Sequence, residues 1–168
     1  SEVSGINEGL FGQADERIGF KEMISAAEKV YTGDILPPDS DDYISTANLF
    51  AFQAKIIKEL AQQESCIILG RCGNYLLDGG DGVLRVFIHA PLESRIARVA
   101  SYSLAWSERE VARYIRVEDK RRAAYYHYYT GEEWRDAGAY DICLDSEKLG
   151  EDGCVQRIMQ VLPLYSAK

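Results

Sequence analysis

The sequence lacks the features of a membrane, secreted or disulfide-bonded protein. No apolar stretch is long enough to cross a bilayer, and the amino terminus lacks the basic-then-apolar layout of a secretory signal. The four cysteines form no C-x-x-C pair, and two of them, Cys66 and Cys143, fall in expected strands. That position favours buried, reduced thiols over zinc ligands or disulfides. These absences predict a cytoplasmic protein with no membrane partner.

Positive charge is also scarce, because the formal net charge is −8 and the pI is near 4.8. This balance argues against a nucleic-acid partner, which would need a basic face. The charge is uneven, however. Residues 85–135 carry ten Lys and Arg against seven Asp and Glu, whereas the rest carries nine against twenty. A basic segment in an acidic protein predicts a small anionic ligand, and an ordinary solvated helix with mixed charges explains it equally well.

Three short apolar runs indicate the fold class. They are Cys66–Arg71, Val83–Ala90 and Tyr140–Asp145, and a helical pattern follows each of them. This order predicts a single α/β domain with a parallel sheet and flanking helices, for which 168 residues with 46% hydrophobic content suffice. Ligands of such sheets collect beyond the carboxyl ends of strands, where Arg71 should lie. Phosphate is the ligand expected there.

Hydrophobic periodicity and end signals predict the helices. Pro91 suits the first position of a helix, and Ser107 with Glu110 forms a capping box. Thr130-Gly131 should end the helix that this box opens. The expected helices are Asn7–Arg17, Phe20–Tyr31, Tyr43–Gln63, one or two turns over Cys72–Leu77, Pro91 to about Tyr102, Ser107 to about Tyr126, and Glu151–Leu162, with a loop over Gly33–Asp42 and a turn over Asp78–Gly82.

Four tyrosines, at 125, 126, 128 and 129, cannot share one face of a helix. Core packing is favoured for them over stacking on a base. His127 is expected to be exposed among them, His89 to lie at a strand end, and Ser146 to cap a turn after the last strand. Neither histidine has the pattern of a catalytic base.

Four motifs occur in order along the chain. They are Leu69-Gly-Arg71, Pro91-x-x-x-Arg95-x-x-Arg98, Asp119-Lys-Arg-Arg122 with the tyrosine-rich stretch to Gly131, and Tyr140-Asp-x-x-Leu-Asp145-Ser146. The ordered set resembles the cytidylate kinase-like family of P-loop nucleoside monophosphate kinases over about residues 46–162. The resemblance implies a three-layer α/β domain spanning residues 1–168. Residues 1–45 would form the helical and loop region that binds the monophosphate, 46–162 the core and lid, and 163–168 a tail.

The resemblance also implies roles for the arginines. Arg71 would grip the acceptor phosphate with its forked guanidinium, and Asp119 would lie on the substrate side. Arg95 and Arg98 would hold the donor's phosphates, and Arg98, Arg121 and Arg122 would stabilise the transferred phosphoryl group. Simpler roles compete: a salt bridge at a strand end for Arg71, and helix-face charge beside Glu93 for Arg95 and Arg98. Cytidylate kinases commonly have Asp after the first arginine, and this chain has Cys72.

The sequence contains no G-x-x-x-x-G-K-[ST] loop, which in these kinases cradles the donor phosphates and helps to hold Mg²⁺. The resemblance places that loop on a central first strand upstream, so we expect an earlier segment in the natural protein and no activity from this chain alone. ATP and Mg²⁺ are the implied cofactors, and no metal ligands are predicted here.

The sequence therefore predicts ATP-dependent phosphorylation of a small pyrimidine nucleotide such as CMP or dCMP. One alternative is an inactive nucleotide- or anion-binding module, with assembly as a homo-oligomer left open. Another is a kinase for a different small acceptor, because acceptors vary widely on a shared fold.

Overall fold

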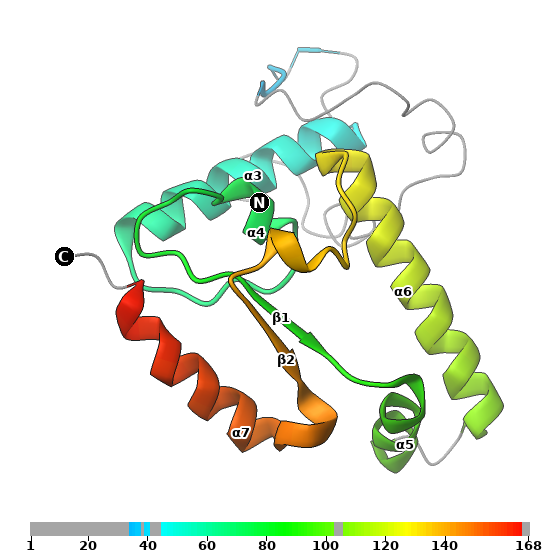
Figure 1. Cartoon of the computed structure of the whole chain (residues 1–168). Helices are drawn as coiled ribbons and strands as arrows, with labels where there is room; N and C mark the ends of the chain where they lie inside the picture. The colour runs from blue at the N-terminus through cyan, green and yellow to red at the C-terminus, as the bar shows by residue number, and fades with distance from the viewer. Residues whose placement is uncertain (1–33, 38, 41–44, 103–105, 166–168) are drawn as a thin grey trace. The chain divides into compact units, whose positions relative to one another are not determined.

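The computed structural model describes residues 34–37, 39–40, 45–102 and 106–165. Helical segments precede, separate and follow the two strands (Figure 1). The elements are α3 Thr46–Gln63, α4 Gly73–Leu76, β1 Val86–His89, α5 Leu92–Tyr102, α6 Glu108–Thr130, the 3₁₀ helix η1 Ala137–Ala139, β2 Ile142–Asp145, α7 Ser146–Val161 and the 3₁₀ helix η2 Leu162–Leu164. The helices expected over 7–17 and 20–31 lie outside the described residues.

The chain divides into two compact units. The first unit comprises Ser1–Leu77 and Arg121–Trp134, and the second comprises Asp78–Lys120 and Arg135–Lys168. Helix α6 contributes its amino-terminal part to the second unit and its carboxyl-terminal part to the first. The expectation that residues 1–168 act as one domain stays a prediction, and each unit is described by itself.

The sheet of the second unit contains two parallel strands among the described residues. Val86 pairs with Ile142 at one end of the ladder, and His89 pairs with Asp145 at the other. Helix α7 packs against both strands and lies alongside them in Figure 1. The mixed α/β class with a small parallel sheet and flanking helices is therefore confirmed. Both strands are shorter than the apolar runs that predicted them, and His89 ends β1 as expected.

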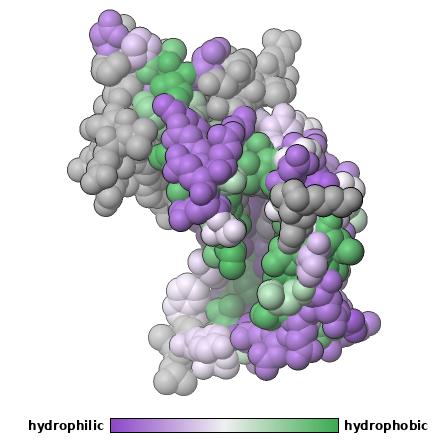
Figure 2. Space-filling view, turned by 90° about the vertical axis from the view of Figure 1, so that its left-hand side faces the viewer, coloured by the Kyte–Doolittle hydropathy of each residue, from purple (hydrophilic) through white to green (hydrophobic). Residues whose placement is uncertain are grey.

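The strand predicted over Cys66–Arg71 is wrong in the described structure, where residues 65–69 form neither helix nor strand. Within this run Ile68 packs on the first unit's core, while Ile67 and Leu69 on either side of it are 91% and 85% exposed. Apolar, β-branched residues favour an extended backbone, but a strand also needs a hydrogen-bonded neighbour, and no described residue supplies one here. Figure 2 shows that both hydrophobic and hydrophilic residues are exposed on one face of the protein.

The core of the first unit joins α3, α4 and the end of α6. Phe50 of α3 stacks on Tyr129 of α6, with ring centroids 3.8 Å apart and planes 10° apart. Tyr125 meets Tyr129 edge-on at 4.8 Å, and Tyr126 is equally buried. The packing role predicted for the tyrosines is thus confirmed, with Tyr128 half-buried against the same cluster. The phenol of Tyr129 donates a hydrogen bond to the carbonyl of Thr46 at 3.1 Å.

Local signals set the helix ends with small corrections. Ser45 caps α3 by accepting a hydrogen bond from the Asn48 amide, so this helix starts three residues after the predicted Tyr43. The Pro91 carbonyl accepts from the Arg95 amide, and Pro91 therefore precedes α5 rather than opening it. The capping box of Ser107 and Glu110 is confirmed, with the Ser107 amide 2.8 Å from the Glu110 carboxylate. The Ser107 hydroxyl also donates to this carboxylate, and that hydrogen bond, together with the one from the amide, lowers the pKa of Glu110.

The ends of α6 and α7 also differ from expectation. Helix α6 continues past Tyr126 to Thr130 and stops at Gly131, whose φ of +73° suits glycine. Helix α7 starts at Ser146, five residues before the predicted Glu151, and contains a break at Gly150. Its cap is Asp145, not Ser146, because the Asp145 carboxylate accepts from the Glu147 amide. Ser146 is buried, and its hydroxyl donates to the His89 carbonyl.

All four cysteines are free thiols. Cys72 and Cys154 are buried, but Cys66 and Cys143 are exposed, which corrects the prediction of buried strand cysteines. The physical reason is that Cys66 lacks a strand neighbour and Cys143 points away from the covered face of β2, where Leu144 is buried. Among the described helices, none is long and apolar enough to traverse a bilayer.

Candidate functional site

Arg71 lies in a turn with an unusual backbone. Gly70, Arg71 and Cys72 have φ angles of 69°, 55° and 55°, so two non-glycine residues in succession adopt the left-handed region. Such conformations are costly and persist where the surroundings fix them, often at functional sites. The amide of Gly73 closes the turn by donating to the Gly70 carbonyl at 2.9 Å. The Nη1 atom of Arg71 is buried, so the turn and its surroundings define where this guanidinium lies.

A core residue follows Arg71. Cys72 is 4% exposed and belongs to the same cluster as Phe50 and Leu76. A carboxylate at this position would lose its hydration among apolar side chains, whereas a thiol fits there at little cost. The sequence difference from the cytidylate kinases thus has a packing explanation.

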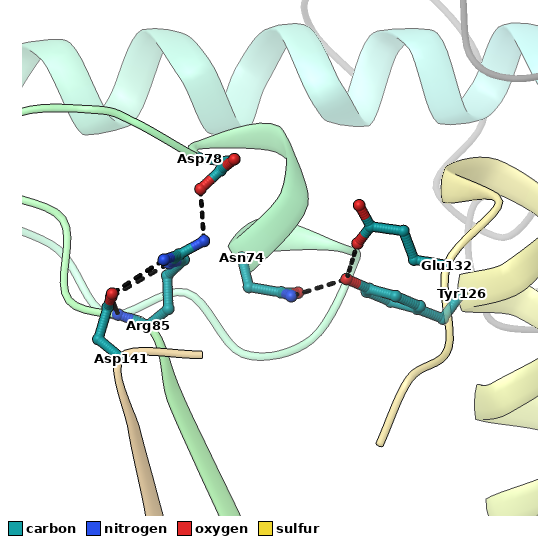
Figure 3. Close-up of polar contacts among 6 residues, drawn as sticks. All are labelled: Asn74, Asp78, Arg85, Tyr126, Glu132 and Asp141. Carbon is teal, nitrogen blue, oxygen red and sulfur yellow. Dashed lines mark hydrogen bonds and ion pairs between the residues drawn. The ribbon is translucent and has the colours of Figure 1, made fainter. Parts of the chain in front are cut away.

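A polar network lies at the start of α4, three residues after Arg71. The Asn74 amide nitrogen donates to the Tyr126 hydroxyl at 2.8 Å, and that hydroxyl donates to the Glu132 carboxylate at 3.2 Å (Figure 3). The Thr130 hydroxyl accepts from the Glu132 amide at 3.0 Å. The network ties the short helix after Arg71 to the end of α6, within the first unit.

Arg121 and Arg122 follow on the part of α6 that belongs to the first unit. Both are exposed, whereas the tyrosines one turn later are buried. The first unit therefore contains three of the predicted site residues, Arg71, Arg121 and Arg122. Which of the two helical arginines faces a ligand stays a prediction.

The second unit contains the remaining predicted residues, and it brings two of them together. Arg95 of α5 makes a two-pronged ion pair with Asp119 of α6, through Nη1 to Oδ2 at 2.7 Å and Nη2 to Oδ1 at 2.6 Å. This hydrogen bonding raises the pKa of Arg95, against the opposing effect of desolvation. Arg98, one turn further along α5, is exposed. Sequence reasoning assigned Arg95 and Asp119 to different ligands and did not anticipate their pairing.

Two further arginines of the second unit were missed. Arg135 donates from Nη2 to Asp119 Oδ2 at 2.7 Å, so Asp119 accepts from two guanidinium groups. Arg85 pairs with Asp141 at 2.9 Å and also with Asp78 (Figure 3). The only available signal for Arg85 was its odd position, since it is a charged residue at the start of an apolar run. Arg135 has no motif that would have revealed it.

The Arg85–Asp141 pair fastens the start of β1 to the start of β2. Asp141 accepts from the Arg85 backbone amide at 2.7 Å as well as from its side chain. The side-chain hydrogen bond is the main cause that lowers the pKa of Asp141 and raises the pKa of Arg85, with desolvation opposing both shifts. This pair lies at the amino ends of the strands, opposite the ends where ligands of parallel sheets collect. Its role is to hold the strand register.

Residues 1–148 match the sequence profile of the cytidylate kinase-like family. The chain belongs to this family. Two curated relatives, each named cytidylate kinase, come from Methanosarcina acetivorans and Methanosarcina mazei, and they are 31% and 30% identical over 87 residues. These matches cover 51% of this chain and 48% of each relative, so the alignment spans about half the length of the relatives.

A solved structure supports the fold of this cytidylate kinase-like chain. It is the crystal structure of an uncharacterized protein from Eubacterium ventriosum, with a TM-score of 0.64 and 24% identity. The match covers 94% of this chain and 82% of that one. At this identity the likeness establishes the shared fold alone.

The residues of this family member suit phosphate better than they suit a metal ion. The arginines of both units offer planar, permanently charged donors that match phosphate oxygens. By contrast, no group of three or more His, Cys, Asp or Glu within residues 34–37, 39–40, 45–102 and 106–165 is placed to hold a metal ion. The ligands of Mg²⁺ are therefore not assigned to side chains of the described part of the chain.

Proposed function

We propose that this protein is a nucleoside monophosphate kinase that transfers a phosphoryl group from ATP to a pyrimidine nucleotide such as CMP or dCMP. Membership of the cytidylate kinase-like family supports the reaction class. The observation that carries the proposal is Arg71, a charged residue at the family's motif position whose guanidinium is partly buried in a left-handed turn. The surrounding structure holds this costly backbone conformation in place and thereby fixes the position of a positively charged side chain.

The proposed roles follow from guanidinium chemistry. Arg71 would bind the phosphate of the acceptor, and Arg95 and Arg98 the phosphates of ATP. Arg98, Arg121 and Arg122 would neutralise charge on the transferred phosphoryl group, because this reaction needs positioned cations more than it needs a base. Bound Mg²⁺ would supply the remaining charge neutralisation on ATP. The three-layer P-loop fold and a cytoplasmic location belong to the same proposal.

Turnover by the full-length protein tests the proposal. A coupled assay with ATP should detect ADP formation with CMP, dCMP or UMP as acceptor. Arg71→Ala should lower kcat/KM by at least about a hundredfold, as expected when a phosphate-binding cation of an active site is removed. Arg157→Ala is the matched control, because Arg157 is exposed on α7, its guanidinium donates to Gln160, and it belongs to none of the family's motifs.

The alternatives give distinct results in the same assays. An inactive nucleotide-binding module would bind CMP in a calorimeter, lose affinity in Arg71→Ala, and form no ADP. A kinase for another small acceptor would form ADP only when that acceptor replaced the pyrimidine nucleotides. Absence of both binding and turnover with every nucleotide would refute the assignment.

A further inference from the structure

Asp119 of α6 lies between two arginines from different parts of the second unit. Arg95 of α5 binds both carboxylate oxygens, at 2.6 and 2.7 Å, and Arg135 binds Oδ2 at 2.7 Å. Arg135 precedes η1, so the cluster joins two helices and the segment that leads to β2. A carboxylate that accepts from two guanidinium groups fixes the position of both.

The exposure of the three side chains is graded. The Asp119 side chain is 14% exposed, that of Arg95 is 29% exposed and that of Arg135 is 62% exposed. Asp119 therefore lies at the base of the cluster, and the Arg135 guanidinium reaches the solvent. An anion arriving from solvent would meet Arg135 first.

Within these three side chains, two guanidinium groups face one carboxylate. Arginine side chains carry a permanent charge in proteins, and the hydrogen bonds to Asp119 raise the pKa of Arg95 further. Two cations repel each other unless an anion bridges them, and Asp119 supplies that bridge from within the protein. A phosphate can supply a second bridge on the exposed side.

Further charged residues lie near the cluster in the chain. Arg98 follows Arg95 by one turn of α5, and Arg116 precedes Asp119 by one turn of α6, so each lies on the same side of its helix as its partner in the cluster. Both are exposed. Arg98 and Arg116 thus add positive charge beside the pair, whereas Glu118 and Asp136 add negative charge next to Asp119 and Arg135 in the chain.

We propose that Arg135 contacts the phosphates of a polyphosphate ligand, and that Asp119 is a positioning residue that holds Arg135 beside Arg95 for this contact. The inference rests on the proposed kinase function, in which Arg95 faces the phosphate donor, and adds Arg135 to that set. It also assigns Asp119 a role through the arginines rather than a contact with the acceptor.

A purely structural role for the cluster makes different predictions. If Asp119 only fastened α5 to α6, losing Arg135 would lower the thermal stability and leave phosphate binding unchanged. The positioning role instead changes the affinity for polyphosphate and the KM for ATP, while the KM for the acceptor nucleotide stays constant. A change in the KM for ATP and in polyphosphate affinity therefore indicates the positioning role, and a change in thermal stability alone indicates the structural role.

The test uses the full-length protein and inorganic tripolyphosphate as probe, measured by titration calorimetry at low and high salt. Arg135→Ala should weaken tripolyphosphate binding and raise the KM for ATP by about tenfold, the loss expected for one charge-assisted hydrogen bond. Arg135→Lys should recover part of the affinity, since it keeps the charge and loses the planar fork. Asp119→Asn should weaken binding similarly, because its arginines are no longer held together. Arg157→Ala should match the wild type.

The outcomes separate this inference from the kinase assignment. Tripolyphosphate binding that weakens in Arg135→Ala, in a protein that phosphorylates no nucleotide, would support the anion contact and reject the kinase. ATP-dependent turnover with an unchanged KM for ATP in Arg135→Ala would keep the kinase and overturn the inference. Wild-type protein that binds no tripolyphosphate at millimolar concentration would also overturn it. Because Arg135 is mostly exposed, its variants should fold even where Asp119→Asn does not.

Discussion

The two units of this protein are stabilised in different ways. Of the buried apolar residues among those described, eleven lie in the first unit and four in the second. Among the ion pairs between described residues, those with partly buried side chains lie in the second unit, where Arg85 meets Asp78 and Asp141, and Asp119 meets two arginines. Truncating a packed aromatic side chain lowers the free energy of unfolding, whereas the contribution of an ion pair changes with pH and salt. The two units should therefore unfold under different conditions.

Each unit has its own fluorescent reporter, which makes the comparison measurable. Trp134 packs against the core of the first unit, and Trp106 meets Tyr114 edge-on in the second, with ring centroids 5.3 Å apart. These are the two tryptophans of the chain. A Trp106→Phe background therefore reports on the first unit, and a Trp134→Phe background reports on the second.

The largest effect is expected from Phe50→Ala in the first unit. Phe50 is 2% exposed and stacks on Tyr129, so truncation removes buried area and leaves a cavity. The free energy of unfolding should fall by about 3 to 5 kcal/mol, measured by urea unfolding in the Trp106→Phe background. Tyr102→Ala is the control, because Tyr102 is 82% exposed and should cost little. A small loss from Phe50→Ala would mean that the aromatic stack does not stabilise the unit.

An intermediate effect is expected from Asp141→Asn in the second unit. Arg85 lowers the pKa of Asp141, so the folded carboxylate binds its proton less readily than the unfolded one. The stabilisation is present above the unfolded pKa, near pH 4, and is lost as the pH falls through the folded pKa. Asp141→Asn should cost about 1 to 2 kcal/mol at pH 7 and flatten this acid dependence.

The Trp134→Phe background measures this change by urea unfolding between pH 2 and pH 7. Asp78→Asn is the matched control, because Asp78 binds the same arginine but its side chain is 63% exposed. It should cost less and leave the acid dependence intact. An unchanged acid slope in Asp141→Asn would show that other carboxylates set the stability of the second unit in acid.

Sequence reasoning succeeded where a structural feature depends on neighbouring residues. The capping box of Ser107 and Glu110 spans four positions, and the stop at Gly131 depends on one backbone angle. Both are local, so the sequence contained all that was needed. The parallel sheet was also predicted, because alternating strands and helices leave few other arrangements.

Features that depend on distant residues could not be predicted in the same way. The Arg95–Asp119 pair joins residues 24 positions apart, and Arg85–Asp141 joins residues 56 apart, so both follow from tertiary packing. The run from Cys66 to Arg71 has strand-like residues, but strand formation depends on a neighbour that the run itself does not contain. The left-handed backbone at Arg71 could not be predicted either, because the conformational preference of arginine disfavours positive φ angles.

The smallest effect should come from the Lys55–Glu59 pair of α3, which tests whether ion pairs matter in the first unit. The charged atoms are 3.8 Å apart, and the side chains are 49% and 47% exposed, so water and salt screen them. Lys55→Ala should change the free energy of unfolding by less than about 0.5 kcal/mol, as is usual for exposed pairs one helical turn apart. A double-mutant cycle with Glu59→Ala, followed by Trp134 fluorescence at low and high salt, measures the coupling directly. A coupling above about 1 kcal/mol that disappears in salt would exceed this range and show that both units depend on charge.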